Sequence, residues 1–411
     1  MFNVKSRTEV FEIIKNNFTM ESISTEKISL YDSLGRITSQ DIFSKENLPS
    51  FNRSSVDGYA VKAFDTFGSS DSVPSILKLV GEVMMGDKPH FTIGSGEAAY
   101  VPTGGEIPQG ADSMVMIEYT EDYSDGFINI LKASSPGGNV VMLGDDILAN
   151  EIAIKASHKI RPQDMGILAA LGYEEIPVKR RLNIGIISTG DEVVAVNAKI
   201  TGAQVRDVNT FTIYGGLLEM GINPRVYGII KDDFGIMKNT LLKALDECDA
   251  VLISGGSSVG TRDQTLNVIE AIKRPEDAGV LVHGIAIKPG KPTIIGKIKD
   301  KAVFGLPGHP ASAYFIFKII VGWYINAMNG IDDAHKTPSI QVILDVNYPS
   351  NAGREEYLPV SIYKENGITK AKPIFGKSGL ITTLSRADGY IHIDRNKEGL
   401  AMGSKVNVLI I

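Results

Sequence analysis

The chain has a single cysteine, Cys248, in 411 residues. It also has fewer basic than acidic residues, 42 lysines and arginines against 48 aspartates and glutamates. One cysteine cannot form an internal disulfide bond, which excludes a disulfide-held secreted scaffold and favours a reducing compartment. For Cys248 itself, a small buried residue at a helix end is favoured over a nucleophile. The formal net charge of -6 argues against a nucleic-acid partner, because such partners usually require a basic protein surface.

Long hydrophobic runs and metal-binding histidine patterns are also missing. The N-terminal residues have no apolar stretch of the kind that secretory signals carry. The most apolar segment, 314–328, has only about fifteen residues and contains Lys318, which makes it too short and too charged to span a bilayer. The six histidines are scattered without zinc-ligand spacing. These absences predict a cytoplasmic protein with no membrane segment and no zinc.

What the sequence does contain is a central series of short apolar runs, each followed by a glycine-rich or acidic loop and then a helical pattern. This order predicts a central α/β/α domain with a parallel-type sheet over residues 181–330. In open parallel sheets, ligands bind beyond the carboxyl ends of the strands. Four expected strand ends carry Glu192, Asp232, Asp263 and Pro307, so we expect the active site there.

The remaining residues read as three further regions. Residues 48–148 contain short strands separated by glycine, proline and aspartate, which predicts a β-rich inserted domain. Residues 331–411 alternate in the same way and are expected to close into a small C-terminal β-barrel. Segments 1–47 and 149–180 are expected to form one discontinuous N-terminal domain around the insertion. The fold class predicted is therefore multidomain α/β plus β.

Glycines and lysines of the central loops indicate an anion-binding site. Gly255 and Gly256 open the loop GGSSVGTR, where bare backbone N–H groups can approach a ligand closely. A Walker-type nucleotidase is rejected, because Thr261 stands where a phosphate-binding P-loop needs lysine. Lys288 and Lys291 place two ammonium groups on a loop stiffened by prolines, which suits a compact dianion; a solvated hairpin is the alternative.

The acidic residues at the strand ends would repel such an anion unless a cation lay between them. Glu192, Asp232 and Asp263 therefore predict Mg²⁺, which takes one or two carboxylates together with phosphate oxygens. The alternative is that each acid caps a helix or solvates a loop, and for any one acid alone that alternative is preferred. In the β-rich region, the loops that carry Asp57 and Thr103 are equally open to interpretation as ordinary turns.

Seven motifs in sequence order closely resemble the molybdopterin molybdenumtransferase family, the MoeA-like proteins that include the E domain of gephyrin. The resemblance covers nearly the whole chain. It implies an elongated homodimer of four-domain subunits, in which the molybdopterin-binding α/β domain of one subunit faces the β-rich domain of the other. The motifs are PSFNRSSVDGYAV, VPTGGEIPQGADSMVMIE, ISTGDE, DVNTFTIYG, ISGGSSVGTRD, IKPGKP and FGLPGHPASA.

The same resemblance implies a reaction in molybdenum cofactor biosynthesis. Molybdate is inserted into adenylylated molybdopterin, with Mg²⁺-dependent hydrolysis of the adenylate and release of AMP. A molybdopterin adenylyltransferase is the implied upstream partner. Two alternatives remain open: a non-catalytic molybdopterin-binding scaffold, and an enzyme like the molybdopterin adenylyltransferases.

The resemblance, together with the loops above, gives a set of candidate site residues. Two positions depart from the family pattern: Gly284 stands where some relatives have lysine, and His309 stands where asparagine is frequent. Arg354 and Ser385 belong to loops of the C-terminal β region, where solvated turns are the alternative. The catalytic candidates are Asp57, Thr103, Asp146, Glu192, Asp232 and Asp263, of which the last three are the candidate metal ligands. The substrate-binding candidates are Thr189, Gly190, Asp191, Gly255, Gly256, Ser257, Lys288, Lys291, Pro307, Gly308, Arg354 and Ser385.

Overall fold

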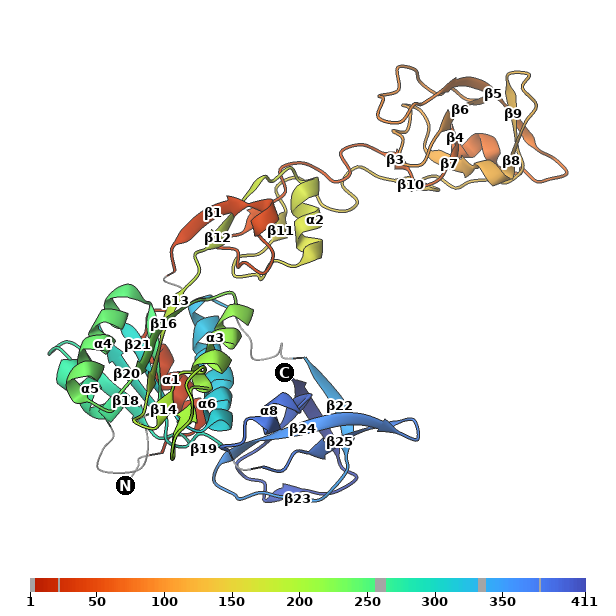
Figure 1. The fold of residues 1–411 in the computed structure, drawn as a ribbon. Helices are drawn as coiled ribbons and strands as arrows, with labels where there is room; N and C mark the ends of the chain where they lie inside the picture. Colours follow the sequence, from red (N-terminus) through yellow and green to blue (C-terminus); the bar gives the residue numbers. More distant parts are fainter. Residues whose placement is uncertain (1–3, 21–22, 256–263, 332–337, 377) are drawn as a thin grey trace. The chain divides into compact units, whose positions relative to one another are not determined.

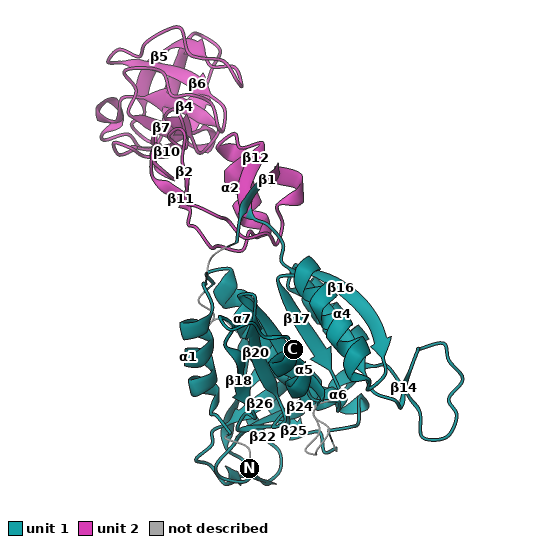
Figure 2. Cartoon of the chain, turned by 90° about the vertical axis from the view of Figure 1, so that its left-hand side faces the viewer, with its two compact units in different colours: residues 1–26, 179–411 teal, residues 27–178 magenta. Residues whose placement is uncertain are grey.

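The computed structural model describes residues 4–20, 23–255, 264–331, 338–376 and 378–411 (Figure 1). The chain divides into two compact units, coloured separately in Figure 2. Unit 1 comprises residues 1–26 and 179–411, and unit 2 comprises residues 27–178.

Unit 1 contains a six-stranded sheet in the order β16-β13-β17-β21-β20-β18 (Figure 1). The first four strands run parallel, which confirms the parallel-type sheet predicted for the α/β domain. Strand β20 is antiparallel to both neighbours, because the turn at Lys299 and Asp300 returns the chain directly into β21. Both turn residues have positive φ angles, 51° and 61°, which is the backbone of a tight hairpin turn. The strands are β13 (Asn183–Thr189), β16 (Asn223–Ile230), β17 (Ala250–Ser254), β18 (Gly279–His283), β20 (Ile294–Ile298) and β21 (Lys301–Leu306).

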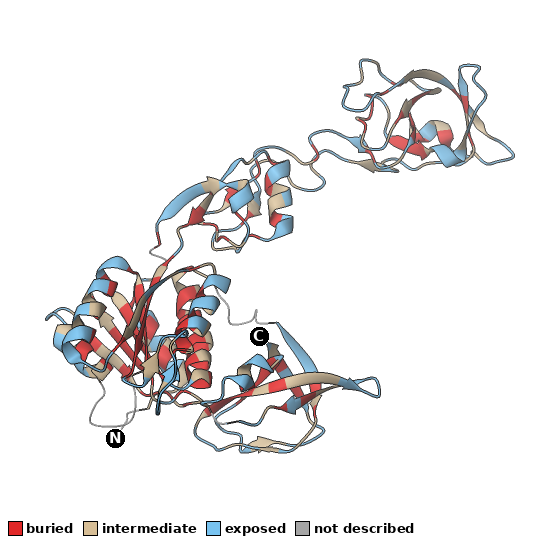
Figure 3. Ribbon diagram, in the orientation of Figure 1, coloured by how far each residue is buried: buried red, intermediate tan, exposed pale blue. Residues whose placement is uncertain are grey.

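Helices cover both faces of this sheet and create two hydrophobic cores. Helices α1, α3, α6 and α7 contribute to the first core, and α4 and α5 contribute to the second. Alternate residues of one strand serve the two cores: Leu252 lies in the first and Ile253 in the second. Figure 3 shows the resulting burial of the central strands. The helices are α1 (Arg7–Asn17), α3 (Asn209–Glu219), α4 (Phe234–Glu247), α5 (Gln264–Ile272), α6 (Pro310–Ile316) and α7 (Gly322–Met328).

The apolar segment expected at 314–328 is part of a longer helical stretch, Pro310–Met328, in which Phe317–Val321 form a π-helical turn between α6 and α7. It has 19 residues, more than the sequence reading allowed, and among the described residues it alone is long and apolar enough to cross a membrane. However, 61% of its most apolar window is buried inside the protein. The helix fills the first core, which explains its composition without a membrane.

Helix α1 packs in unit 1, on the α/β sheet side. Ser6 and Glu9 form a reciprocal capping box at its start, which satisfies two backbone N–H groups. Phe11 stacks on Trp323 of α7, with ring centroids 4.1 Å apart and planes 11° apart. The four-domain division, which groups residues 1–47 with 149–180, stays a prediction in its boundaries. Helix α1 itself lies in unit 1, where its apolar face packs in the same hydrophobic core as residues of α7.

The C-terminal residues of unit 1 form the expected small barrel. Five strands close in the order β24-β25-β22-β28-β26, and β26 pairs again with β24. A further strand, β19, comes from the α/β region and pairs with the start of β24. The elements are β19 (Ile287–Lys288), β22 (Ser339–Leu344), β23 (Tyr348–Pro349), β24 (Glu355–Glu365), β25 (Ile368–Pro373), α8 (Thr382–Ser385), β26 (Gly389–Ile393), β27 (Gly399–Leu400) and β28 (Lys405–Ile410).

Unit 2 contains the β-rich region that the sequence predicted. Its six-stranded sheet has the order β7-β4-β6-β5-β9-β8. The glycine of the DGYA motif, Gly58, is required by strand packing, because a Cβ atom there would lie 2.0 Å from the backbone oxygen of Val115. The strands are β3 (Arg53–Ser54), β4 (Gly58–Val61), β5 (Ser75–Glu82), β6 (Glu97–Val101), β7 (Ser113–Met116), β8 (Thr120–Asp122), β9 (Phe127–Ile130) and β10 (Val140–Val141).

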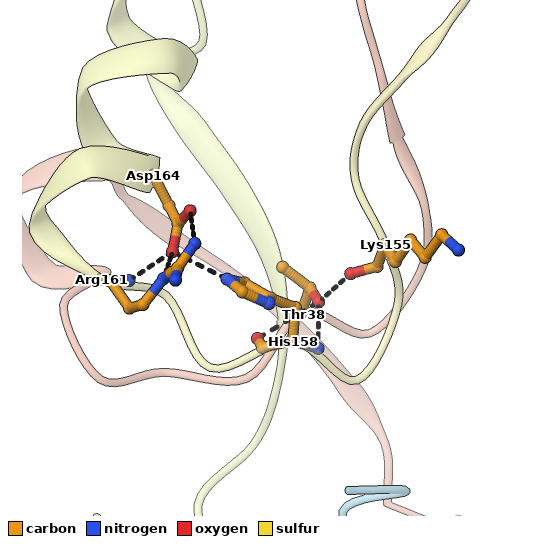
Figure 4. A network of polar contacts seen from close by, with 5 residues as sticks. All are labelled: Thr38, Lys155, His158, Arg161 and Asp164. Atoms are coloured by element: carbon orange, nitrogen blue, oxygen red, sulfur yellow. Dashed lines mark hydrogen bonds and ion pairs between the residues drawn. The ribbon is translucent and has the colours of Figure 1, made fainter. Parts of the chain in front are cut away.

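The rest of unit 2 is a small α+β region held by the polar network of Figure 4. Asp164, in the first turn of α2, accepts hydrogen bonds from the backbone and side chain of Arg161 and contacts His158 Nε2 at 2.7 Å. Thr38 Oγ1 donates to the carbonyl of Lys155 and accepts from the backbone N–H of His158. The network therefore joins the helix start to strand segments distant in sequence. The elements are β1 (Thr25–Ser29), β2 (Ile42–Phe43), β11 (Ile152–Ile154), α2 (Pro162–Ala170) and β12 (Glu175–Lys179).

Candidate active site

The carboxyl ends of the parallel strands open into one cavity of about 1450 Å³ in unit 1. Strand β13 leads to Thr189, β17 to Gly255, and β21 to Pro307, because parallel neighbours end at the same sheet edge. Residues of the C-terminal barrel complete the wall, among them Arg354. The strand-end loops where the sequence predicted the site therefore line one cavity.

Most candidate residues of the α/β region share this cavity. Asp191 does not line it but accepts a hydrogen bond of 3.3 Å from the backbone N–H of Asp232. Ser385 also lies outside the lining, although Thr383 of the same helix belongs to it. The candidates that line the cavity are Thr189, Gly190, Glu192, Asp232, Gly255, Lys288, Lys291, Pro307, Gly308 and Arg354. Gly256, Ser257 and Asp263 lie outside the described residues.

On the acidic side of the cavity, the surroundings of Asp232 disfavour its ionised form. Burial, followed by the negative charges of Asp191 and Glu192, raises the pKa of Asp232 above its ordinary value. Over residues 4–20, 23–255, 264–331, 338–376 and 378–411, no three His, Cys, Asp or Glu side chains are arranged to hold a metal ion. Within the described residues, two of the three predicted metal ligands, Glu192 and Asp232, therefore line the same cavity and interact electrostatically. The third, Asp263, lies outside the described residues.

The basic side of the cavity is built where two parts of unit 1 meet. Lys288 in β19 pairs in parallel register with Glu356 in β24, and its ammonium group lies 2.8 Å from the Glu356 carboxylate. Arg354 precedes that strand by one residue, and Lys291 follows on the same loop as Lys288. The cavity therefore presents three cationic side chains from two segments that are distant in sequence. This arrangement can hold a compact anion.

The sequence reading missed three polar residues of the site. The Asn209 amide donates to Ser254 Oγ and to the Gly308 carbonyl, each at 2.8 Å, and so ties two strand-end loops together. Asp207 accepts a hydrogen bond from the backbone N–H of Thr210 near the start of α3. Glu356 is the third, and its REEY context gave no signal beyond a polar strand start.

Two buried oxygen atoms of the cavity wall have no hydrogen-bond partner within the described part of the chain: Thr189 Oγ1 and Asn209 Oδ1. Unpartnered buried polar atoms are rare in folded proteins, and a ligand is one of the partners that can satisfy them. Gly255 lies against the same threonine. A Cβ atom at position 255 would lie only 2.2 Å from the Thr189 carbonyl oxygen, so no larger residue fits there. Its φ angle of 105° also requires glycine.

The candidates from the β-rich region lie in unit 2, where a hydrogen bond links Asp57 and Thr103. The carboxylate of Asp57 accepts a hydrogen bond of 2.8 Å from the backbone N–H of Thr103. The backbone N–H of Asp146 donates to the carbonyl of Leu48 at 2.9 Å. The DGYA and PTGG motifs are therefore not independent turns, since one carboxylate joins them. Their relation to the cavity of unit 1 remains a prediction.

The chain matches three family descriptions that together span most of its length. Residues 5–172 match the MoeA N-terminal region (domain I and II), residues 185–326 match the probable molybdopterin binding domain, and residues 341–411 match the MoeA C-terminal region (domain IV). These matches agree with the resemblance seen in the motifs.

Individual relatives agree with the family matches. The chain is 33% identical to a putative molybdopterin biosynthesis protein of Methanocaldococcus jannaschii, over 98% of this chain and 96% of that one. It is 30% identical to a protein of Haemophilus influenzae named molybdopterin molybdenumtransferase, over 93% of each chain. A solved structure, the molybdopterin biosynthesis moeA protein of Pyrococcus horikoshii OT3, superposes with a TM-score of 0.85 at 30% identity over 100% of both chains. The chain belongs to the MoeA family.

Proposed function

We propose that this chain is a molybdopterin molybdenumtransferase of molybdenum cofactor biosynthesis. It inserts molybdate into adenylylated molybdopterin, hydrolyses the adenylate and releases AMP. The observation that carries the proposal is that one cavity holds a cationic side, with Lys288, Lys291 and Arg354, and an acidic side, with Glu192 and Asp232. Two oppositely charged sides suit a reaction that combines an oxyanion with a phosphoanhydride.

The cationic side is the molybdate site. Molybdate is a tetrahedral dianion, so two ammonium groups and a guanidinium group can neutralise it and donate to its oxygens. The Gly255 and Gly308 loops, which Asn209 ties together, form the neighbouring wall that receives the pterin. Thr189 lines the same cavity, and its buried Oγ1 atom, which has no hydrogen-bond partner in the described part of the chain, is the proposed donor to that substrate.

The acidic side fits Mg²⁺ in chemistry. Carboxylate oxygens are the ligands that Mg²⁺ prefers. A cation next to Asp232 would offset the burial, and then the repulsion by Asp191 and Glu192, that raise the pKa of this residue. Glu192 and Asp232, with Asp263 from outside the described residues, are the proposed ligands. When bound, Mg²⁺ supplies positive charge to the oxygens of the phosphoanhydride. The chain's own part is to hold these carboxylates at the strand ends, where they exclude the adenylate phosphates unless the cation is present.

The active form is a homodimer. Helix α3 exposes an apolar stripe at helical spacing, with Phe211 59%, Tyr214 39% and Leu218 51% exposed. A second copy of the chain is the proposed cover for this stripe. In the dimer, the β-rich domain of one subunit would bring Asp57, Thr103 and Asp146 to the cavity of the other; the four-domain division and the cytoplasmic location belong to the same proposal.

The test is direct. Purified protein is mixed with adenylylated molybdopterin, molybdate and Mg²⁺, and AMP release is measured together with molybdenum incorporation. The proposal predicts both products, and loss of both on chelation of Mg²⁺. A scaffold would bind the substrate without AMP release. An adenylyltransferase-like enzyme, which the molybdopterin-binding domain alone would also suit, would instead consume ATP and molybdopterin. The upstream adenylyltransferase supplies the substrate in the proposed pathway.

A further inference from the structure

Two neighbouring glutamates begin strand β24, and both are buried, with Glu355 7% and Glu356 4% exposed. Consecutive side chains of a strand point to opposite faces, so the two carboxylates meet different partners. Glu355 contacts Arg7 of α1 and His392 of β26, away from the cavity. Glu356 lines the cavity and contacts Lys288. The pair therefore offers a cavity-facing carboxylate and a matched one that faces elsewhere.

The Glu356 carboxylate is held firmly. Its Oε1 atom accepts from the Tyr348 hydroxyl at 2.7 Å and contacts the Lys288 ammonium at 2.8 Å, and its Oε2 atom accepts from the Ser350 hydroxyl at 2.5 Å. By contrast, the Lys288 side chain is 41% exposed. The fixed partner is thus the carboxylate, and the lysine is positioned by it. An ammonium group has three N–H donors, so the contact with Glu356 leaves two that can face an oxyanion.

We propose that Glu356 is a positioning and specificity-determining residue of the oxyanion site: it fixes the Lys288 ammonium at the cavity wall, and its charge lowers the affinity for dianions more than for monoanions. This inference rests on the proposed function, in which Lys288 binds molybdate. An oxyanion that contacts the Lys288 ammonium is separated from the Glu356 carboxylate only by that ammonium group. The wall thereby holds the oxyanion loosely enough to be transferred.

The charge dependence follows from Coulomb's law. The repulsion between Glu356 and a bound anion is proportional to the anion's charge, so molybdate feels twice the repulsion that a monoanion feels at the same place. Perrhenate is a tetrahedral oxyanion of similar size with a single negative charge, which makes it the matched probe. Removal of the carboxylate charge should therefore change the logarithm of the molybdate affinity twice as much as that of perrhenate.

The main experiment compares two isosteric variants of the full-length protein, Glu356→Gln and Glu355→Gln. Titration calorimetry measures the binding of sodium molybdate and of sodium perrhenate. We expect Glu356→Gln to tighten molybdate binding by about tenfold and perrhenate binding by about threefold, in line with partly screened repulsion. Glu355→Gln removes the same charge from the same strand and should change neither affinity. Thermal unfolding of both variants verifies that they are folded.

A second comparison, between Lys288→Gln and Lys291→Gln, does not depend on the folding of Glu356→Gln. Lys288→Gln leaves the Glu356 carboxylate unopposed, so it should weaken molybdate binding more than Lys291→Gln does. The double variant Lys288→Gln/Glu356→Gln should bind molybdate more tightly than Lys288→Gln, and by a larger factor than Glu356→Gln gains over the wild type. The factor differs because only the wild type has a Lys288 ammonium whose positioning is lost, and such a difference is the coupling expected for residues in contact. An equal gain in the two backgrounds would overturn the positioning role.

The two proposals fail in different ways. Weaker or unchanged molybdate binding by folded Glu356→Gln, or equal gains for molybdate and perrhenate, would refute the proposed effect of the Glu356 charge on anion affinity. Tightening by Glu355→Gln as well would assign the effect to the strand rather than to the lysine contact. A wild-type protein that shows the predicted anion behaviour but releases no AMP from adenylylated molybdopterin would refute the proposed reaction and leave the role of Glu356 in place.

Discussion

Replacement of Asn209 by alanine should loosen the cavity wall without disturbing the rest of the fold. The Asn209 amide spans the end of β17, through Ser254, and the loop after β21, through Gly308. The backbone N–H of Gly255 also bonds to the Leu306 carbonyl, at 3.3 Å, and so reports on the separation of the same two strand ends. Alanine removes both side-chain links and keeps the helical backbone.

The magnitude follows from the two lost hydrogen bonds. Each contributes about 1 kcal/mol net in a folded protein, so together they hold the loops by about 2 kcal/mol. Gly308 is exposed and Ser254 is buried, which means that water can replace the first partner more easily than the second. A loss of about 2 kcal/mol corresponds to a local opening that is about 30-fold more frequent.

Amide hydrogen exchange measures this opening directly. Peptides that cover Gly255 and residues 305–310 should exchange up to about 30-fold faster in Asn209→Ala, and the KM for adenylylated molybdopterin should rise with them. Thr212→Ala is the matched control, because the Thr212 hydroxyl donates to the carbonyl of Val208, the N-cap residue of the same helix. Unchanged exchange at Gly255 in Asn209→Ala, with an unchanged KM, would refute the assignment of Asn209 to the cavity wall.

Three further predictions concern the acids, the dimer and unit 2. Asp232→Asn should raise the Mg²⁺ concentration needed for AMP release by about 10- to 100-fold, measured by Mg²⁺ titration; an unchanged requirement would remove Asp232 from the ligand set. Phe211→Asp should convert the proposed dimer to monomers, as measured by light scattering. The control variant Lys243→Asp, which changes an exposed residue of α4, should leave the dimer intact. Hydrogen bonds from Arg161, and then from His158, hold the pKa of Asp164 below its ordinary range. The ionised carboxylate therefore stabilises the folded protein fully above the unfolded-state pKa of about 3.9, and this contribution is lost as the pH falls through the folded-state pKa. Asp164→Asn should therefore lower the melting temperature at pH 7 and differ progressively less from the wild type below about pH 4.

The layered part of the fold was predictable because its signals are local. Short β-branched runs alternate with helical patterns between residues 181 and 330, and each loop begins where a strand pattern ends. The antiparallel direction of β20 was not predicted, because the turn at Lys299 and Asp300 lacks the glycine that usually marks such a hairpin. The contact of α1 with the α/β region was also not predicted. Residues 1–47 were expected to join 149–180, and the pattern of the helix shows an apolar face but not that Trp323 completes it.

The site was predictable where chemistry and strand ends coincide. Thr189, Glu192, Asp232 and the lysine loop all follow strand ends, and the sheet brings them to one cavity. Residue types alone could not assign Glu356, because a glutamate at a strand start is ordinarily a solvated charge. Its importance comes from the pairing of β19 with β24, a contact between segments 68 residues apart that no local pattern encodes.

Asn209 and Glu356 share a physical property that separates them from the residues found in the motifs. Each is tied to another group of the cavity: the Asn209 amide donates to the Gly308 carbonyl, and the Glu356 carboxylate contacts the Lys288 ammonium. A group that binds substrate can be inferred from its chemistry, whereas a group that positions another must satisfy a geometry that only the folded chain defines. Both residues bridge elements that different parts of the sequence supply, and both are buried, so a loosened bridge would alter the cavity before it altered the core. The expected signature of such residues is a change in substrate affinity with little change in global stability, which is what the paired variants at 209 and 212, and at 356 and 355, are designed to separate.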